Sequence, residues 1–414
     1  MLTLAAQALQ QTKDPAEIIN RLVDAEEVVQ FLMAEVDEGL APEEQLVMKG
    51  VAALLGRPGT TDAIETAVDI ANVRRTLTYL TNRFLLHVLD GPRAKEYREH
   101  DIVREFYYGL LSKRELRAIH RRCGIYYEQE ELDPLRAAQH FVRAGDAQKA
   151  IRLITDSLTS LLHRGDSMQI MTVLAAAELD VLPLESKIDL HLAQAEALRF
   201  RGRSEEAQAV CQQALGQLAA MAPSPWVTSR RAQAAQLMAR ILDRGDPQAA
   251  QSWAQQAVDL LAPVDPQRAG MYVVLASTFA RAGRFDEARQ SVELALGALG
   301  SRRDETYIDA LTTMGSLLSV RGDIVAGAAA TAEALALAQT LDDPFRTVRL
   351  MMNIGLDKAD AGALEEGIRY QQDALKVAER IGSLEMQADL CVNLGDLLLI
   401  RATRCRRRLP YARN

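Results

Sequence analysis

Histidine and cysteine side chains bind transition metals and act as bases or nucleophiles, and this chain has six histidines and four cysteines. The histidines are His87, His100, His120, His140, His163 and His191. No two of them are four residues apart and no His-Glu-x-x-His occurs, so the sequence does not predict a zinc site on a helix. We expect His120 and His140 to pack or cap on helices rather than to bind a metal.

The cysteines are far apart in the sequence and form no Cys-x-x-Cys. They are Cys123, Cys211, Cys391 and Cys405. Their spacing argues against a disulfide scaffold or a four-thiolate zinc site and is typical of a protein from a reducing cytoplasm. Cys123 follows Arg121 and Arg122, whose charges would lower its pKa, but the interpretation we favour is a cysteine on a helix surface with no further role.

Nucleotide hydrolysis by a phosphate loop needs glycine N–H groups that cradle the phosphates, followed by a lysine and a serine or threonine. The sequence contains no Gly-Lys dipeptide and no Gly-x-Ser-x-Gly elbow. Residues 337–343 resemble the apolar strand and acid of a magnesium-binding motif, but they fall in a predicted repeat helix and we interpret the match as coincidence. We therefore expect a chain that is not an enzyme and that has no metal and no cofactor.

Length and charge exclude further classes of protein. With 414 residues the chain is long enough for two or three domains or for a repeat array. Lys and Arg total 48 against 56 Asp and Glu, a net charge of −8, which does not favour a protein that mainly wraps nucleic acid. The longest run without a charge, residues 207–229, contains glutamines and prolines, so we expect no membrane span and a cytoplasmic location.

The second half of the chain repeats about every 40 residues. Five glycines mark similar tight turns: Gly202, Gly245, Gly283, Gly322 and Gly362. A small residue stands five positions after each glycine, an alanine twelve positions after, and a mostly small residue seven positions before. We interpret each unit as a helix, a turn with left-handed backbone at the glycine, and an antiparallel helix, with the small residues where the two helices approach closely. The predicted fold class is all-α.

This pattern resembles the tetratricopeptide repeat, in a longer version that lacks the closing proline. The large residues that the family prefers in its first helix have counterparts at Leu237, Leu275, Met314, Ile354 and Leu394. The resemblance implies a superhelix over residues 166–400 with a concave surface lined by the first helices. Residues 401–414 are rich in arginine, and we expect an irregular tail there.

Residues 27–111 predict a winged-helix domain, in which three helices precede a small β-hairpin. The expected elements are a helix that opens at residues 40–44 and runs through 55, helices at 62–70 and 72–80, a strand at 84–89, a tight turn at 90–92, a returning strand that ends at residue 100, and a helix at 102–111. A helical connector is expected over residues 112–165.

The run from Tyr97 to Phe106 resembles the His-Asp motif that follows the wing in signal-transduction NTPases of the STAND class. Residues 119–127 and 137–146 resemble the connector of maltose-activator-type regulators, and residues 1–26 resemble the end of the NTPase lid. The resemblance implies the winged helix and repeat sensor of such a regulator without its NTPase core. It also implies a separate NTPase subunit as a candidate partner.

His100 and Asp101 have two interpretations. In the STAND class the corresponding histidine faces the diphosphate of bound nucleotide, so the two residues would sense nucleotide if an NTPase partner exists. Taken from the residues alone, Asp101 caps a helix that begins at Ile102, and His100 ends the wing strand. For the isolated chain we favour the second interpretation.

We predict a non-catalytic scaffold that binds a protein or peptide on the concave repeat surface. The residues projected onto that surface are Ser277, Thr313, Ser316, Arg349, Asn353 and Asn393. The alternative is a DNA-binding transcriptional regulator of the maltose-activator type that uses the winged helix or a lost output domain. Residues 91–125 carry nine basic side chains but also five acidic ones, which favours surface ion pairs over a phosphate-binding patch.

Overall fold

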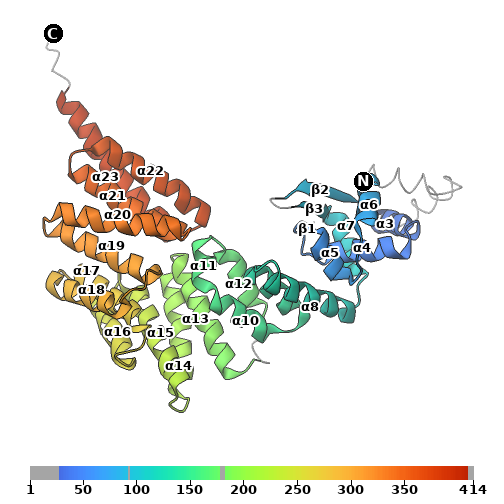
Figure 1. The fold of residues 1–414 in the computed structure, drawn as a ribbon, viewed down its shortest axis with the longest axis horizontal. Helices are drawn as coiled ribbons and strands as arrows, with labels where there is room; N and C mark the ends of the chain where they lie inside the picture. The colour runs from blue at the N-terminus through green and yellow to red at the C-terminus, as the bar shows by residue number, and fades with distance from the viewer. Residues whose placement is uncertain (1–27, 92–93, 178–181, 409–414) are drawn as a thin grey trace, which may run out of the picture. The chain divides into compact units, whose positions relative to one another are not determined.

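The computed structural model of the chain describes residues 28–91, 94–177 and 182–408 (Figure 1). It divides into two compact units, Met1–Leu153 and Ile154–Asn414. Helices dominate both units, and the only strands in the described part of the chain form one small sheet. The predicted lid remnant, residues 1–26, lies outside the described residues.

The first unit contains the sheet. Its elements are α3 (Val28–Glu38), α4 (Pro42–Ala52), β1 (Gly59–Thr60), α5 (Thr61–Val68), α6 (Arg74–Asn82), β2 (Leu86–Asp90), β3 (Lys95–Glu99), α7 (Asp101–Gly109), α8 (Lys113–Gln129) and α9 (Pro134–Ala144), and α10 (Ala147–Asp156) spans the division. The strands are antiparallel in the order β1-β3-β2, with Val88 opposite Tyr97. The predicted layout of three helices followed by a hairpin is therefore present. The added strand β1 is too short for a sequence pattern to indicate it.

Local capping explains most of the boundaries in the first unit. Proline opens α4, and the Glu44 carboxylate accepts the Ala41 N–H at 2.8 Å. At α8 the capping box is complete, because the Ser112 hydroxyl accepts the Glu115 N–H and the Glu115 carboxylate accepts the Ser112 N–H. The prediction for Asp101 is wrong: α7 begins at Asp101, His100 is the N-cap, and no side chain makes the cap hydrogen bond. Asp101 instead lies 3.8 Å from Arg104 in the first turn.

The second unit is a row of helical hairpins. It opens with the short helices α11 (Leu158–His163) and α12 (Ser167–Ala175). Five hairpins follow, each a first and a second helix: α13 (Leu184–Phe200) with α14 (Ser204–Ala219), α15 (Pro225–Leu242) with α16 (Pro247–Leu260), α17 (Arg268–Arg281) with α18 (Phe285–Leu299), α19 (Glu305–Val320) with α20 (Ile324–Thr340), and α21 (Pro344–Asp360) with α22 (Leu364–Ile381). After the five hairpins comes α23 (Leu384–Arg408), which occupies the position of a first helix. Each second helix packs on the next first helix, so successive hairpins touch.

The turn glycines lie between paired helices, as the repeat predicts. Gly202, Gly283, Gly322 and Gly362 have positive φ angles of 74°, 73°, 89° and 91°, a conformation that glycine adopts without steric cost. Gly245 is the exception, because α15 ends through right-handed residues and Gly245 keeps a negative φ. The left-handed prediction is therefore wrong at that one turn.

The small residues mark the places where paired helices cross. The alanines twelve positions after the turns, Ala214, Ala257, Ala295, Ala334 and Ala374, are all fully buried. In the hairpin of α21 and α22 the contact is backbone to backbone: a Cβ added at Gly367 would lie 2.5 Å from the carbonyl oxygen of Gly355. No side chain fits there without moving a helix.

Replacing Gly367 by alanine is expected to lower the free energy of unfolding of the whole second unit, called the repeat unit from here on, by about 1–3 kcal/mol. The reason is that the new methyl group forces α21 and α22 apart. The control is Gly216→Ala on α14, where nothing lies within 4 Å and alanine favours the helix by up to about 1 kcal/mol. Urea unfolding followed by tryptophan fluorescence measures both variants, since Trp226 and Trp253 lie in this unit. Equal stabilities of the two variants would contradict the close crossing.

The end of the array differs from the prediction. The irregular tail expected from residue 401 is wrong up to Arg408, because α23 continues as a helix through that residue. Continuation is physically reasonable, since residues 401–408 contain no glycine or proline to end the helix.

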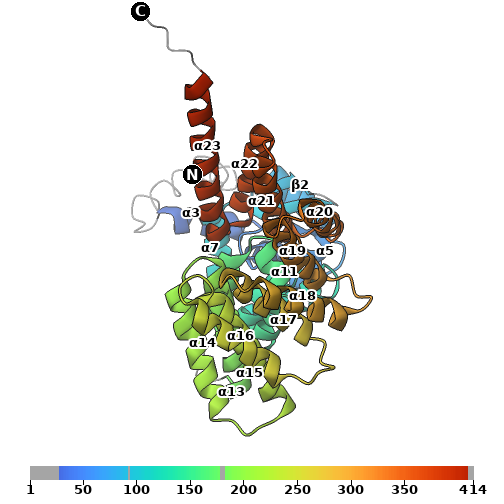
Figure 2. The ribbon, with the colours of Figure 1, turned by 90° about the vertical axis from the view of Figure 1, so that its left-hand side faces the viewer.

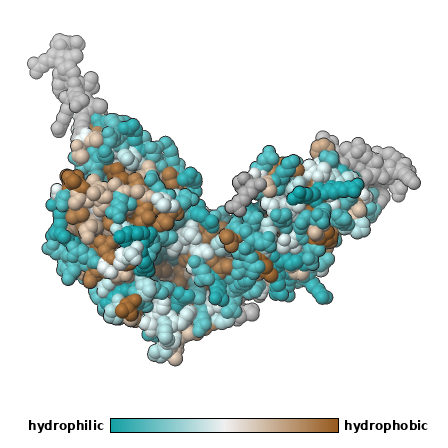
Figure 3. Space-filling model, viewed as in Figure 1, coloured by the Kyte–Doolittle hydropathy of each residue, from teal (hydrophilic) through white to brown (hydrophobic). Residues whose placement is uncertain are grey.

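None of the helices in the described ranges combines the length and the apolar character that crossing a lipid bilayer requires. Hydrophilic side chains cover most of the face shown in Figure 3, with apolar side chains gathered in one region of the repeat unit.

Candidate interaction surface of the repeat unit

The first helices form one side of the repeat unit. Each first helix from α13 to α21 contacts the next first helix along the chain, in addition to its own second helix. Neighbours that touch in this way lie on the inner, tighter side of a curved array. We call the side chains that the first helices present on this side the inner surface.

Ion pairs join neighbouring first helices across the inner surface. An acid on one first helix, or directly after it, meets an arginine on the next, 37 to 44 residues later in the sequence. The pairs are Asp189–Arg230, Glu196–Arg240, Asp243–Arg281 and Asp309–Arg346, with distances of 2.7, 3.0, 2.5 and 2.8 Å. The spacing equals the repeat length, so this recurring acid–arginine pairing is a signal that the sequence contains and that the residue-by-residue prediction missed.

The most buried of these groups is Arg346, near the start of α21. Its guanidinium donates two hydrogen bonds to the Asp309 carboxylate, at 3.1 and 2.8 Å, in the fork geometry that makes such pairs strong. It also donates to Asp343 at 2.6 Å and to Glu305 at 3.1 Å. Asp343 is itself the N-cap of α21 and accepts the Arg346 N–H at 3.0 Å. The side chains of Arg346 and Asp343 are only 9% and 6% exposed.

The electrostatic balance of this cluster follows from burial and charge together. Burial raises the pKa of Asp343, but the hydrogen bond and charge of His163 and the charge of Arg346 outweigh burial and hold the pKa well below its usual range. Burial likewise raises the pKa of Asp309, and Arg346 and Arg349 reverse the shift and lower it. Both carboxylates are therefore ionised at neutral pH: Asp343 depends for this on His163 and Arg346, and Asp309 on Arg346 and Arg349.

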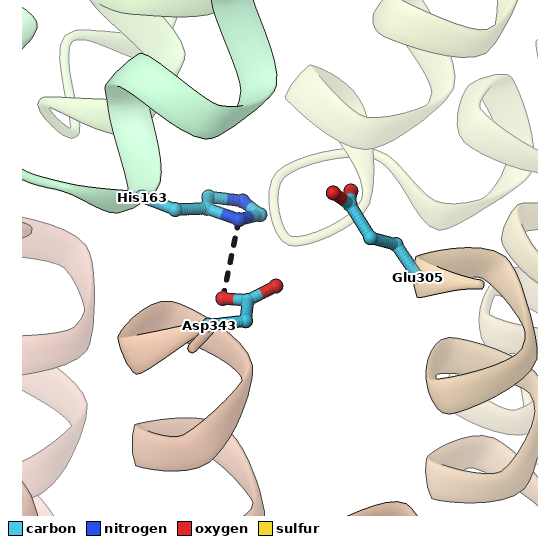
Figure 4. Close-up of side chains that lie close together, drawn as sticks. All are labelled: His163, Glu305 and Asp343. Atoms are coloured by element: carbon cyan, nitrogen blue, oxygen red, sulfur yellow. Dashed lines mark ion pairs between the residues drawn. The ribbon is translucent and has the colours of Figure 1, made fainter. Parts of the chain in front are cut away.

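His163, Glu305 and Asp343 lie close enough together to be considered as metal ligands, with one ligand atom from each within 4.8 Å of the others (Figure 4). The Nδ1 atom of His163 is 3.2 Å from Asp343. Arg346 Nη1, however, lies 2.6, 3.1 and 3.3 Å from atoms of Asp343, Glu305 and His163. A fixed positive charge thus already lies among the three groups and repels a second cation, so this donor set does not fit a metal ion.

The two ends of the repeat unit meet across the inner surface. Arg244, in the turn after α15, donates to Asp389 on α23 at 2.8 Å, and Arg199 on α13 lies 3.6 Å from Glu385. These partners are separated by more than 140 residues in the sequence. The array therefore curves far enough for its first hairpins to contact its last helix.

Two further contacts close the same junction. The His163 ring stacks on Phe345 with the ring centres 4.4 Å apart, which joins α11 to α21. The turn after α11 also approaches α22, since a Cβ at Gly165 would lie 2.9 Å from the Ile381 backbone.

Glu196 links the ion pairs of α13 and α15. It accepts two hydrogen bonds from Arg199, both at 3.1 Å, and one from Arg240 at 3.0 Å. Burial raises the pKa of Glu196, but the charges of Arg199 and Arg240 outweigh burial and bring it to about 2. Glu196 is therefore ionised at neutral pH, between the two arginines.

Three of the six predicted partner-binding residues, Ser316, Arg349 and Asn353, take part in contacts between α19 and α21. Arg349 on α21 pairs with Asp309 on α19, and the Asn353 amide donates to the Ser316 hydroxyl at 3.4 Å between the same two helices. The hydroxyls of Ser277 and Thr313 donate to carbonyls one turn earlier in their own helices. Asn393 is half-buried on α23. The structure thus brings Ser316, Arg349 and Asn353 together on adjacent helices.

The buried histidines of the first unit pack as expected. His120 on α8 and His140 on α9 face each other, with their Nδ1 atoms 2.9 Å apart. The Tyr108 hydroxyl lies 3.2 Å from His120 Nε2, and the Tyr127 ring stacks on His140. The expectation for Cys123 is wrong: this cysteine is buried, and burial raises the pKa of its thiol to about 12.

His100 and Asp101, by contrast, are exposed at the junction of β3 and α7. Among the described residues of the first unit, both side chains are accessible to solvent.

No protein-family model matches the chain, and the curated proteins contain no match in sequence. In structure the chain is similar to a STAND protein, a signal transduction ATPase with numerous domains, that carries a tetratricopeptide repeat sensor, from Pyrococcus horikoshii. The two are 16% identical, the TM-score is 0.58, and the match covers 94% of this chain. The chain spans 62% of the length of that protein. At this identity the similarity establishes the fold: the second unit is a superhelix of tetratricopeptide-like repeats.

Two weaker similarities are to a Rap protein complexed with competence and sporulation factor and to BtubC from P. vanneervenii. The Rap protein is 12% identical with a TM-score of 0.40, over 97% of this chain and 98% of its own. BtubC is 19% identical with a TM-score of 0.34, over 56% of this chain and 96% of its own. Neither is close enough to bear on function.

Proposed function

We propose that the chain is a non-catalytic scaffold that binds a protein or peptide on the inner surface of the repeat unit. The observation that carries the proposal is a polar cluster that two neighbouring first helices present together: the Asp309–Arg349 ion pair and the Ser316–Asn353 hydrogen bond. Such a cluster offers a peptide main chain hydrogen-bond donors and acceptors from adjacent helices and can exchange ion pairs with its side chains.

We further propose that the chain is the sensor and regulatory portion of a STAND-type regulator. The order of α4, β1, α5, α6 and the β2–β3 hairpin supports a winged helix in the first unit. The exposed His100 and Asp101 follow directly after that hairpin, where a separate NTPase subunit would reach them. The fold similarity to a STAND protein with a repeat sensor agrees with this arrangement.

A peptide-display library panned against the full chain tests the scaffold proposal. Peptides that bind the wild type are labelled and measured by fluorescence anisotropy. Replacing Arg349 and Asn353 together by alanine is expected to raise the Kd about tenfold or more, because two polar contacts at the centre of the surface are lost. Ser316→Trp should have a similar effect by filling the surface without breaking an ion pair.

The control is Arg289→Ala, on the second helix α18, where the arginine pairs only with the exposed Glu293 on the same helix. Its Kd should match that of the wild type. A thermal melt followed by tryptophan fluorescence confirms that each variant is folded. Unchanged affinity in both inner-surface variants would place the binding surface elsewhere.

A further inference from the structure

Four charged side chains join the two ends of the repeat unit, and we call them the clasp. They are Arg199 on α13, Arg244 in the turn after α15, and Glu385 and Asp389, which lie one turn apart at the start of α23. Arg244 lies 3.5 Å from Glu385 and donates to Asp389 at 2.8 Å. Arg199 lies 3.6 Å from Glu385. The helix that carries the two acids lies beside α22 at the end of the row of hairpins (Figure 2).

Separate apolar cores lie on the two sides of the clasp. The helices α13, α14 and α15 bury one core around Cys211 and Leu237, and α21, α22 and α23 bury another around Val348 and Leu390. Among the described residues, none of the helices α11 to α15 packs along α21, α22 or α23. Neighbouring hairpins, by contrast, pack along whole helices. The two ends are therefore held together mainly by side chains.

Water reaches the ion pairs of the clasp. The side chains of Arg244, Glu385 and Asp389 are 50%, 34% and 32% exposed. Ion pairs that are exposed to this extent add little net stability, and dissolved salt screens them. The clasp therefore favours the closed arrangement of the two ends without locking it.

An apolar contact deeper in the same junction provides a pivot. The ring of Phe345, at the start of α21, lies 4.4 Å from the ring of His163 on α11 and 5.2 Å from the ring of Phe200 at the end of α13. Beside it, the turn at Gly165 approaches the Ile381 backbone. Buried rings resist separation more than exposed ion pairs do, so the clasp opens before this contact does.

The closed arrangement leaves little space over the inner surface. Glu196 and Asp309 lie on the inner side of α13 and α19, yet their side chains are only 15% and 22% exposed. Burial lowers the pKa of Arg240 on α15, and the charge of Arg240 interacts with Asp309 on α19 and Arg346 on α21 as well as with Glu196. Charged groups of hairpins that are not neighbours are thus close together.

We propose that the clasp is a reversible closure of the repeat unit, and that opening it about Phe345 admits a partner to the inner surface. The closure stands on the contacts of the two ends alone, whereas the admission of a partner rests on the proposed function. If a partner binds only the open array, its apparent affinity falls with the fraction of molecules that is closed. The strength of the clasp then sets the affinity for the partner.

A spin-label distance measurement on the ligand-free full chain tests the closure. The labels are placed at Ser204→Cys on α14 and Val392→Cys on α23, both exposed, in a Cys391→Ser, Cys405→Ser background whose other two cysteines are buried. We expect one distance at about 0.1 M salt and an additional, longer one at about 1 M salt, because the Debye length falls from about 10 to about 3 Å. Arg244→Glu, which sets three carboxylates together, should give the longer distance at the lower salt concentration.

A charge swap distinguishes an opened clasp from a general loss of stability. Adding Asp389→Arg to Arg244→Glu restores an ion pair and is expected to restore the shorter distance. Arg289→Glu on α18, outside the clasp, should leave the distance unchanged. A tryptophan-monitored melt confirms that each variant is folded. Identical distances in the parent and in Arg244→Glu at both salt concentrations would overturn the proposal, as would an opened variant that the swap does not close.

The peptides selected on the full chain test the admission of a partner. Their Kd, measured by fluorescence anisotropy, is expected to fall about tenfold in Arg244→Glu and to return to the wild-type value in the charge swap. An unchanged Kd in a variant whose ends have separated would show that the clasp does not control access. If no peptide binds either protein, the proposed function fails and the control of access fails with it, whereas the spin-label distances still decide whether the clasp opens.

Discussion

Replacing Arg346 by methionine is expected to lower the free energy of unfolding of the repeat unit by about 3–5 kcal/mol at neutral pH. Methionine fills much of the same volume but removes the main counter-charge of Asp309 and a hydrogen-bonded counter-charge of Asp343 in a buried site. Removal of one partner from a buried ionic cluster costs far more than the net contribution of the pair, because the remaining charges stay desolvated. Urea unfolding followed by tryptophan fluorescence measures the effect.

The pH dependence of the Arg346 variant gives a second readout. In the wild type the folded pKa values of Asp343 and Asp309 are lowered, so their stabilising contribution is complete above the unfolded value and is lost as the pH falls through the folded pKa. Without Arg346 the folded pKa values of both carboxylates should rise, so the destabilisation should shrink as the pH falls through these raised values. Arg289→Met, which breaks an exposed ion pair, should lower the free energy of unfolding by less than about 1 kcal/mol. This difference from the wild type should not change with pH. A difference from wild type that is small at pH 7 and constant with pH would refute the role of Arg346.

The repeat could be predicted from the sequence because its determinants are local. Two helices that cross closely need small residues at the crossing, and the turn between them needs a residue that tolerates positive φ. Gly315 and Gly322 therefore stand at fixed positions in their unit whatever the rest of the chain does. The left-handed backbone predicted at Gly245 is wrong because a helix can also end through right-handed residues. The sequence alone does not distinguish the two endings.

The contacts that close the repeat unit could not be predicted in the same way. His163 and Arg346 are 183 residues apart, and they meet only because small rotations between successive hairpins add up along the array. Arg346 and Asp309 lie one repeat apart in the sequence, but the sequence does not indicate how tightly the array curves. Asp343 was assigned to a helix interior in the prediction, whereas α20 ends at Thr340 and leaves Asp343 free to cap α21.

The buried histidine pair of the first unit predicts a loss of stability on acidification. Burial lowers the pKa of His120, with a further contribution from Arg143, to about 4. Burial, the charge of His120 and three nearby arginines lower the pKa of His140 as well. In the unfolded chain both rings take up a proton near pH 6.5, so below that pH the unfolded state binds more protons and stability falls by about 1.4 kcal/mol per pH unit for each histidine. The loss from His120 alone should reach about 3 kcal/mol between pH 6.5 and 4.

Urea unfolding followed by circular dichroism at pH 7, 5.5 and 4.5 tests this expectation, and tryptophan fluorescence, which reports the repeat unit, separates the two units. His120→Gln with His140→Phe should be less stable than the wild type at pH 7 but should lose much less stability between pH 7 and 4.5. Phe141→Leu damages the same core without removing a titrating group, so it should keep the steep decline of the wild type. Buried Glu99 acts in the opposite direction, since burial raises its pKa and protonation stabilises the folded state, but this contribution is common to all three proteins and cancels in the comparison. Equal slopes in the double variant and in Phe141→Leu would show that the histidine pair does not control the acid stability of the first unit.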